Sequence, residues 1–266
     1  MEPHLGFGIT AQRDPLAVGL PVLGEQLERL GYRELWANDG RLGSGLATLA
    51  AAVASTTTID LCLGVAPLSA RTPAAIAAEA EPLAIPPDRL VLGVGTGAGS
   101  TLAMVRDAVA ELRLLLPGVR LAIAALGPRM CGLGGEVADV VLLNWASPER
   151  IAWSRQRIAA GAAAVGRPVP RVAAYVRVAI GPDAQVRLEA EAERYRARPR
   201  PYTHLFEAQQ VDRIGIPGVA AEDGPGVAAQ LRPYREALDS CVVRALPVEA
   251  SAAGWFAVAE AATLRA

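Results

Sequence analysis

Residues 88–102 read DRLVLGVGTGAGSTL. The short apolar run Leu90–Gly95 predicts a buried strand, and Thr101–Leu116 repeats apolar side chains at helical spacing. Between them lies the glycine-rich loop Thr96–Ser100. Glycines and a threonine directly before a helix let backbone amides approach a flat ring or a phosphate. A glycine-rich turn that binds nothing is the alternative interpretation.

The same unit of strand followed by helix recurs along the whole chain. The expected strands are Leu5–Thr10, Glu34–Asn38, Ile59–Ala66, Leu90–Gly95, Val119–Ala125, Val140–Asn144, Val172–Ile180 and Cys241–Leu246. Helical patterns cover Leu16–Leu30, Ala47–Ser55, Pro73–Leu83, Thr101–Leu116, Pro128–Glu136, Pro148–Val165, Ala184–Arg198 and Ala250–Leu264. Eight such units predict an α/β fold, a single (β/α)8 TIM barrel over residues 1–266.

Two points bear on that prediction. A doubly wound open sheet is the main rival, but no G-x-G-x-x-G motif follows the first strand. Residues Pro199–Arg232, rich in Pro, Gly and Gln, form a long segment between the seventh and eighth strands. A loop of that length is either functional or partly disordered.

Composition excludes several classes of protein. The chain has 52% hydrophobic residues and a net charge of -1, so no basic field attracts nucleic acid or anionic lipid. All 26 cations are Arg, which excludes a Schiff-base lysine and a P-loop lysine. Three separated cysteines and two histidines give no zinc pattern, and no metal site is expected. Without a signal sequence or an apolar run of membrane-spanning length, a soluble cytoplasmic protein is expected.

In a barrel, chemistry is placed at the carboxyl ends of the strands. The second strand ends in Asn38-Asp39, which either brings an amide and a carboxylate to the mouth or forms a turn. Arg71, after the third strand, could hold an anion or be solvated. Trp145, after the sixth, is either a pocket wall or core. His204 is a candidate proton carrier, with a surface histidine of no role as the alternative.

The end of the fifth strand is suited to a phosphate. It reads Ala125-Leu126-Gly127-Pro128-Arg129 and leads into a helix. The small residues leave room for a ligand, and helix amides together with Arg129 attract an anion. No Ser-His-Asp order and no pair of catalytic carboxylates emerges. These strand ends therefore favour a flat, phosphorylated cofactor over hydrolysis.

Several motifs together resemble the bacterial-luciferase-like family. Residues 30–39 (LGYRELWAND) are similar to its G-Y-x-x-[LI]-W-x-x-D stretch, and residues 88–97 to its G-R-x-x-L-G-x-G-x-G segment. Similar units follow at Leu46–Pro73, at AALGP (residues 124–128) with GGEVAD (134–139), and at the closing strand, residues 240–247. The resemblance spans nearly the whole chain and implies a barrel that binds coenzyme F420, or alternatively FMN, at its mouth.

The resemblance also implies roles for individual residues. Asp39 would lie beside the ring system, and Gly64-Val65 would form a non-prolyl cis peptide against its face. Gly95, Thr96 and Gly97 would line the ring edge. The ribityl phosphate would rest on the residues after the fifth strand, which are Ala125, Leu126, Gly127 and Pro128. Family members are usually dimers, so a homodimer that acts on a small molecule is expected.

This sequence departs from the family's sugar-phosphate dehydrogenases at two acid/base positions. Gly40 stands where they have His, and Ala98 where they have Glu, which argues against that activity. The chain is also short for the family, with reduced insertions after the fourth strand and before the fifth. We therefore expect an F420-dependent oxidoreductase transferring a hydride to or from a small unsaturated or carbonyl compound. The alternatives are an FMN-dependent luciferase-like monooxygenase and a non-catalytic flavin- or F420-binding barrel. Asp39 and His204 are the only catalytic candidates.

Overall fold

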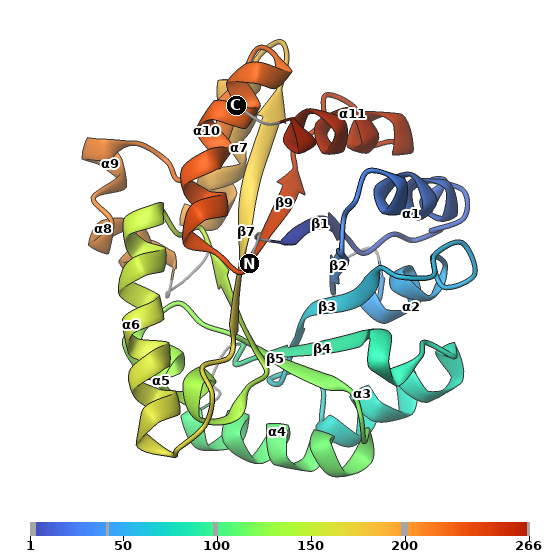
Figure 1. Ribbon diagram of the computed structural model, residues 1–266, viewed down its shortest axis with the longest axis vertical. Helices are drawn as coiled ribbons and strands as arrows, with labels where there is room; N and C mark the ends of the chain where they lie inside the picture. The colour runs from blue at the N-terminus through green and yellow to red at the C-terminus, as the bar shows by residue number, and fades with distance from the viewer. Residues whose placement is uncertain (1–3, 41–42, 98–100, 198–201, 265–266) are drawn as a thin grey trace.

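Eight parallel strands form a closed inner ring in the computed structural model, which describes residues 4–40, 43–97, 101–197 and 202–264 (Figure 1). In ring order each strand pairs with the next along the chain from β1 to β7, and β9 closes the ring between β7 and β1. The strands are β1 (His4–Thr10), β2 (Glu34–Asn38), β3 (Asp60–Pro67), β4 (Leu90–Gly95), β5 (Arg120–Ala124), β6 (Val140–Asn144), β7 (Arg171–Ile180) and β9 (Ser240–Ala245). The predicted (β/α)8 barrel is confirmed.

Helices surround the ring (Figure 1). They are α1 (Leu20–Arg29), α2 (Gly45–Ala50), α3 (Pro73–Ala80), α4 (Leu102–Leu115), α5 (Pro128–Val137), α6 (Pro148–Ala164), α7 (Ala184–Arg196), α10 (Gly224–Ala237) and α11 (Ala252–Thr263), with short 3-10 turns η1 (Glu81–Leu83) and η2 (Pro87–Arg89). Thr72 and Ser147 cap α3 and α6 with their side chains, each before a proline in the first turn. These are the start signals expected from the sequence. Within the described ranges, no helix is both long and apolar enough to span a bilayer.

The segment Pro199–Arg232 is more regular than the sequence suggested. From residue 202 onward it holds α8 (Tyr202–Ala208), α9 (Val211–Ile214), β8 (Val219–Ala221) and most of α10, while residues 198–201 lie outside the described part. Helix α10 was not predicted because it begins Gly-Pro-Gly and contains Pro233, both of which indicate a turn. Strand β8 is not part of the ring, because, among the described strands, it pairs only with β7, at the carboxyl end of that strand (residues 178–180).

Alternation along the strands separates two apolar layers. Outward-facing residues such as Leu35 and Leu61 pack beneath the helices in the main core. Their neighbours Trp36 and Cys62 face the barrel interior, together with Tyr175 and six other buried residues. This inner cluster packs the barrel interior, and two of its members, Leu142 and Tyr175, also border the cavity at the carboxyl ends of the strands.

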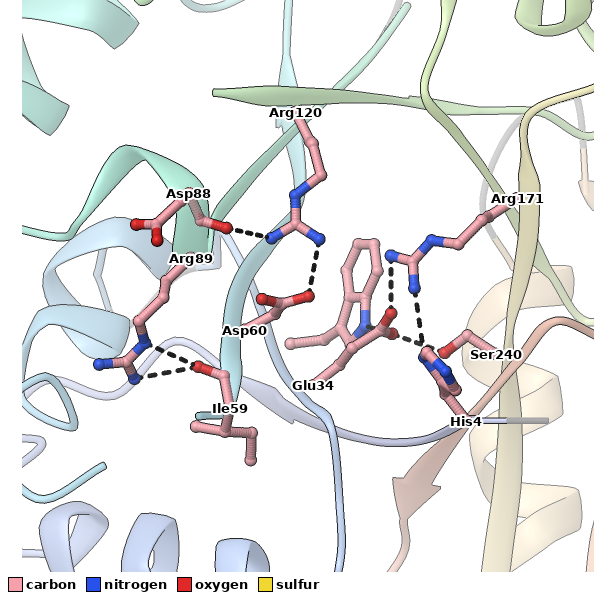
Figure 2. Close-up of polar contacts among 10 residues, drawn as sticks. His4, Glu34, Ile59, Asp60, Asp88, Arg89, Arg120, Arg171 and Ser240 are labelled. Atoms are coloured by element: carbon pink, nitrogen blue, oxygen red, sulfur yellow. Dashed lines mark hydrogen bonds and ion pairs between the residues drawn. The ribbon is translucent and has the colours of Figure 1, made fainter. Parts of the chain in front are cut away.

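The amino ends of the strands carry a layer of ion pairs (Figure 2). Glu34, the first residue of β2, is fully buried and pairs with Arg171 of β7 at 2.9 Å. Asp60, the first residue of β3, pairs with Arg120 of β5 at 2.8 Å. Buried charges are tolerated when they are paired in this way, so the arginines in this layer are structural.

Glu28 of α1 fastens the loop that leads into β3. Its carboxylate accepts hydrogen bonds from the backbone N–H groups of Thr57, Thr58 and Ile59 and from the Thr58 hydroxyl. Desolvation raises the pKa of Glu28, but the hydrogen bonds from Thr58, Thr57 and Ile59 together outweigh it and lower the pKa from 4.5 to about 2.

We expect the stabilising effect of Glu28 to be lost in acid. Its pKa is lower in the folded chain than in the unfolded chain, so its contribution is present above about pH 4.5 and fades as the pH falls toward about 2. The free energy of unfolding of the Glu28→Gln variant should therefore differ from the wild type more at neutral pH than in this acid range. Urea denaturation across pH measures this. Glu25→Gln, on the same helix but solvent-exposed, is the control, and a difference that does not change with pH would contradict the prediction.

Candidate functional site

A cavity of about 610 Å³ lies at the carboxyl ends of the strands. This volume is within the range typical of pockets for small ligands and cofactors. Side chains or backbone from seven of the eight barrel strands reach it, and Leu142 and Tyr175 of the inner cluster form its floor. The lining consists of Asn38, Asp39, Gly64, Val65, Pro67, Gly95, Thr96, Gly97, Ala124, Leu126, Gly127, Met130, Leu142, Asn144, Tyr175, Arg177, Tyr195, Tyr202 and Arg244.

Strand β3 changes course where it reaches the cavity. The Gly64–Val65 peptide is cis, as the resemblance implied, and the pairing of β3 with β4 shifts register between Leu63 and Ala66. The Tyr175 hydroxyl donates a hydrogen bond to the Gly64 carbonyl at 3.0 Å. Gly93 permits the close approach, since a Cβ there would lie 2.3 Å from the Leu63 carbonyl oxygen. This local geometry presents backbone and the Val65 side chain to the cavity.

The end of β4 supplies a second glycine-rich wall. Gly95, Thr96 and Gly97 all line the cavity, and Gly97 has a φ of 61, in the left-handed region that favours glycine. A Cβ on Gly97 would also collide with the side chain of Ser69. Residues 98–100, including Ala98, lie outside the described part of the chain.

Asp39 lines the cavity but is already committed to other contacts. Its Oδ2 pairs with Arg71 at 2.8 Å, and its Oδ1 accepts a hydrogen bond from the Gly45 backbone N–H at 2.9 Å. Arg71 also pairs with Glu79 of α3, so it is neither solvated nor available to an anion. His204 is exposed on α8 and does not line the cavity.

The residues predicted to hold the phosphate do not all lie at the cavity. Leu126 and Gly127 line the cavity, whereas Ala125 is buried in the outer core and Pro128 and Arg129 are exposed on the first turn of α5. No side chain caps α5, and a Cβ on Gly127 would meet nothing within 4 Å. The first amides of α5 are therefore approachable from the cavity, which suits an oxyanion.

Sequence reasoning missed the wall formed by β6, β7 and β9. Asn144, Tyr175, Arg177 and Arg244 project from these strands, and Tyr195 and Tyr202 reach the cavity from α7 and α8. Trp145 is core rather than wall, since it is buried among Leu188, Leu205 and Phe206. Burial raises the pKa of Tyr175 well above its usual value, so its hydroxyl stays protonated and remains a donor. No cluster of metal-ligating side chains occurs in the ranges that the structure covers.

Comparison with known proteins places this geometry in a family. A family model described as luciferase-like monooxygenase matches residues 20–106 and 106–238, well over half of the chain. A 5,10-methylenetetrahydromethanopterin reductase of Methanolobus tindarius is 28% identical over 195 residues, and the match spans 59% of this chain and 60% of that protein's length. The chain therefore matches less than two thirds of that relative.

Solved structures match over nearly their full length. A coenzyme F420-dependent tetrahydromethanopterin reductase from Methanopyrus kandleri superposes with a TM-score of 0.75 and 17% identity, covering 100% of this chain and 98% of its own. The oxygenating constituent of 3,6-diketocamphane monooxygenase from Pseudomonas putida, in complex with FMN, superposes with a TM-score of 0.69 and 13% identity. The match covers 99% of this chain and 97% of that chain. At these identities the structures show a shared fold. The family model, which matches well over half of the chain, establishes that this chain belongs to the luciferase-like monooxygenase family.

Proposed function

We propose that the protein is an F420-dependent oxidoreductase that transfers a hydride between the deazaflavin and a small unsaturated or carbonyl compound. The observation that carries the proposal is the cavity itself, with the cis Gly64–Val65 peptide on one wall and the Gly95–Gly97 loop beside it. The first presents backbone and the Val65 side chain, and the second presents mainly backbone, to a space large enough for a tricyclic ring. The M. kandleri reductase, which shares the fold, supports F420 as the cofactor.

The residues present fit such a cofactor. In the proposal the ring lies against Val65 and Gly95, and its phosphate rests on the uncapped amino end of α5 next to Gly127. When bound, the deazaflavin supplies the hydride chemistry, and the protein positions the ring and the substrate against each other. Asp39, through Arg71 and the Gly45 amide, fixes the mouth of the cavity near the ring.

An FMN-dependent monooxygenase is the second candidate, because the P. putida enzyme shares the fold and contains FMN. Both cofactors carry a tricyclic ring and a phosphate, so the lining residues suit either one.

Parallel titration of the cofactor-free protein with F420 and FMN tests the proposal. We expect tight binding of F420, followed by hydride transfer to carbonyl or unsaturated acceptors under anaerobic conditions. Tight binding of FMN without binding of F420, together with oxygen consumption when reduced FMN is supplied, would instead identify the protein as an FMN-dependent monooxygenase. Binding of either cofactor without turnover on any acceptor would indicate a non-catalytic barrel.

The Gly127→Leu variant tests the placement of the phosphate. The new side chain would occupy the open space beside the amino end of α5, so we expect cofactor affinity to fall by about tenfold or more, the loss of a contact worth over 1.4 kcal/mol. Gly132→Ala is the matched control, because Gly132 lies on the same helix, has nothing near its Cβ and does not line the cavity. If the two variants bound the cofactor with equal affinity, the proposed position of its phosphate next to Gly127 would be wrong.

A further inference from the structure

Two arginines lie side by side on neighbouring strands of the cavity wall. Arg177 of β7 and Arg244 of β9 are direct register partners, and both line the cavity. In ring order β7 and β9 stand opposite β3 and β4, the strands that carry Gly64–Val65 and Gly95–Gly97. A ligand lying against that glycine-rich wall would therefore have the two arginines on its far side.

Arg177 is a buried cation that forms no ion pair with a carboxylate of the described residues. Its side chain is 1% exposed, its Nη1 donates to the Asn144 side-chain oxygen, and its guanidinium lies 4.1 Å from the centre of the Trp145 ring. Its Nε is buried and has no hydrogen-bond partner among the described residues. Glu191, a carboxylate whose charge acts on Arg177, makes its ion pair with Arg194 instead.

Arg244 is half-buried, and one of its two terminal nitrogens is enclosed. Its Nη2 donates to the Thr10 hydroxyl at 2.8 Å, while its Nη1 is buried and finds no partner in the described ranges. The pKa of Arg177 is lowered, mainly by desolvation; Tyr195 acts to raise it, and the nearby charge of Arg244 acts to lower it. The two positively charged guanidiniums therefore repel each other, and no carboxylate of the described residues forms an ion pair with either of them.

The opposite end of the same barrel provides the contrast. There Arg171 and Arg120 are each paired with a carboxylate, Glu34 and Asp60. Among the described residues that line the cavity, Asp39 is the only acid, and Arg71 already neutralises it. A buried charge is costly unless it is paired, so the fully buried Arg177 and its half-buried neighbour Arg244 are explained best by an anion that arrives from outside. Perturbed, uncompensated charges of this kind concentrate at functional sites.

We infer that Arg177 and Arg244 form an oxyanion subsite that binds a carboxylate or phosphate group of the substrate. The inference rests on the proposed function in one respect, namely that the reacting part of the substrate lies between this subsite and a cofactor on the β3–β4 wall. It narrows the substrate from any small carbonyl or unsaturated compound to an acid or a phosphate ester. Guanidinium groups suit this task because they present parallel N–H donors to two oxygens at once.

The test uses matched pairs of probes on the cofactor-free full-length protein. Benzoate and phenyl phosphate are compared with the neutral benzamide and benzyl alcohol by isothermal titration calorimetry. We expect at least one anion to bind about tenfold or more tightly than its neutral counterpart, and the Arg244→Met variant to remove that preference. Arg244→Lys should retain part of it, and Arg232→Met, an exposed arginine on α10, gives a control with the same change in net charge. Arg177→Met repeats the measurement where that variant folds.

Each outcome decides the inference. Loss of the anion preference in Arg244→Met, with F420 or FMN affinity within about twofold of the wild type, supports a substrate subsite. A parallel loss of cofactor affinity would overturn it and assign the arginines to the cofactor's phosphate. Equal binding of anionic and neutral probes by the wild type would also overturn it. Because these probes require no cofactor, failure of both cofactors to bind would count against the proposed function while leaving the subsite measurable.

Discussion

The Glu34→Ala variant is expected to lose about 3 kcal/mol of unfolding free energy. Glu34 is fully buried at the amino end of the barrel, where its Oε2 accepts hydrogen bonds from the Trp36 indole at 2.7 Å and the Ser240 hydroxyl at 2.5 Å. Its Oε1 pairs with Arg171 (Figure 2). Removing the carboxylate leaves two buried donors and a guanidinium without their acceptor, and such orphaned groups carry their full desolvation cost.

Two control variants separate the effect of the Glu34 charge from the effect of its hydrogen bonds and from that of an exposed ion pair. Glu34→Gln keeps an acceptor for Trp36 and Ser240 but loses the charge, so its loss should be smaller. Glu25→Ala removes an exposed pair with Arg29 at 3.7 Å, which should change stability by less than about 0.5 kcal/mol. Urea denaturation gives all three values. If Glu34→Ala proved as stable as Glu25→Ala, the ion-pair layer would contribute nothing to the closure of the barrel.

The barrel was predictable because each local signal agrees with the fold. The run at β4 is apolar and short, and Thr72-Pro73 and Ser147-Pro148 mark the starts of α3 and α6. The cis Gly64–Val65 peptide has no comparable signal in hydrophobic periodicity, and it was expected only through resemblance to a family. The cradle after β5 remains a prediction, and the structure places its residues on two sides of the strand end. Ala124 faces the cavity, whereas Ala125 faces the outer core, since successive strand residues alternate.

The arginine wall was missed for a different reason. The apolar composition of β7 and β9 predicts buried strands, and the rule that barrel chemistry lies at the strand ends points to the loops after the strands rather than to the residues within them. A period of two places Arg171, Tyr175 and Arg177 on one face of β7, and that face is the barrel interior. A charged residue in the middle of a buried strand was the available signal, because such a position demands a partner or a ligand.

The Gly135→Ala variant should also be strongly destabilised, by about 3 kcal/mol. Helices α5 and α6 approach so closely that a Cβ on Gly135 would lie 2.0 Å from the Ile158 carbonyl oxygen and 2.8 Å from the Ala162 nitrogen. Both atoms belong to the backbone of α6, and alanine has no rotamer that avoids them. The added methyl group can be accommodated only by moving the two helices apart, which would open the outer core that they cover.

Gly132→Ala on the same helix makes the comparison independent of helix propensity. A Cβ on Gly132 meets nothing within 4 Å, so alanine should stabilise that variant by up to about 1 kcal/mol through its preference for helix. The identical substitution three residues apart should therefore act in opposite directions, with free energies of unfolding measured in urea under the same conditions. If the two variants were equally stable, α5 and α6 would separate at no cost. Their glycine-mediated contact would then not hold α5, whose amino end we propose as the phosphate site, against the barrel.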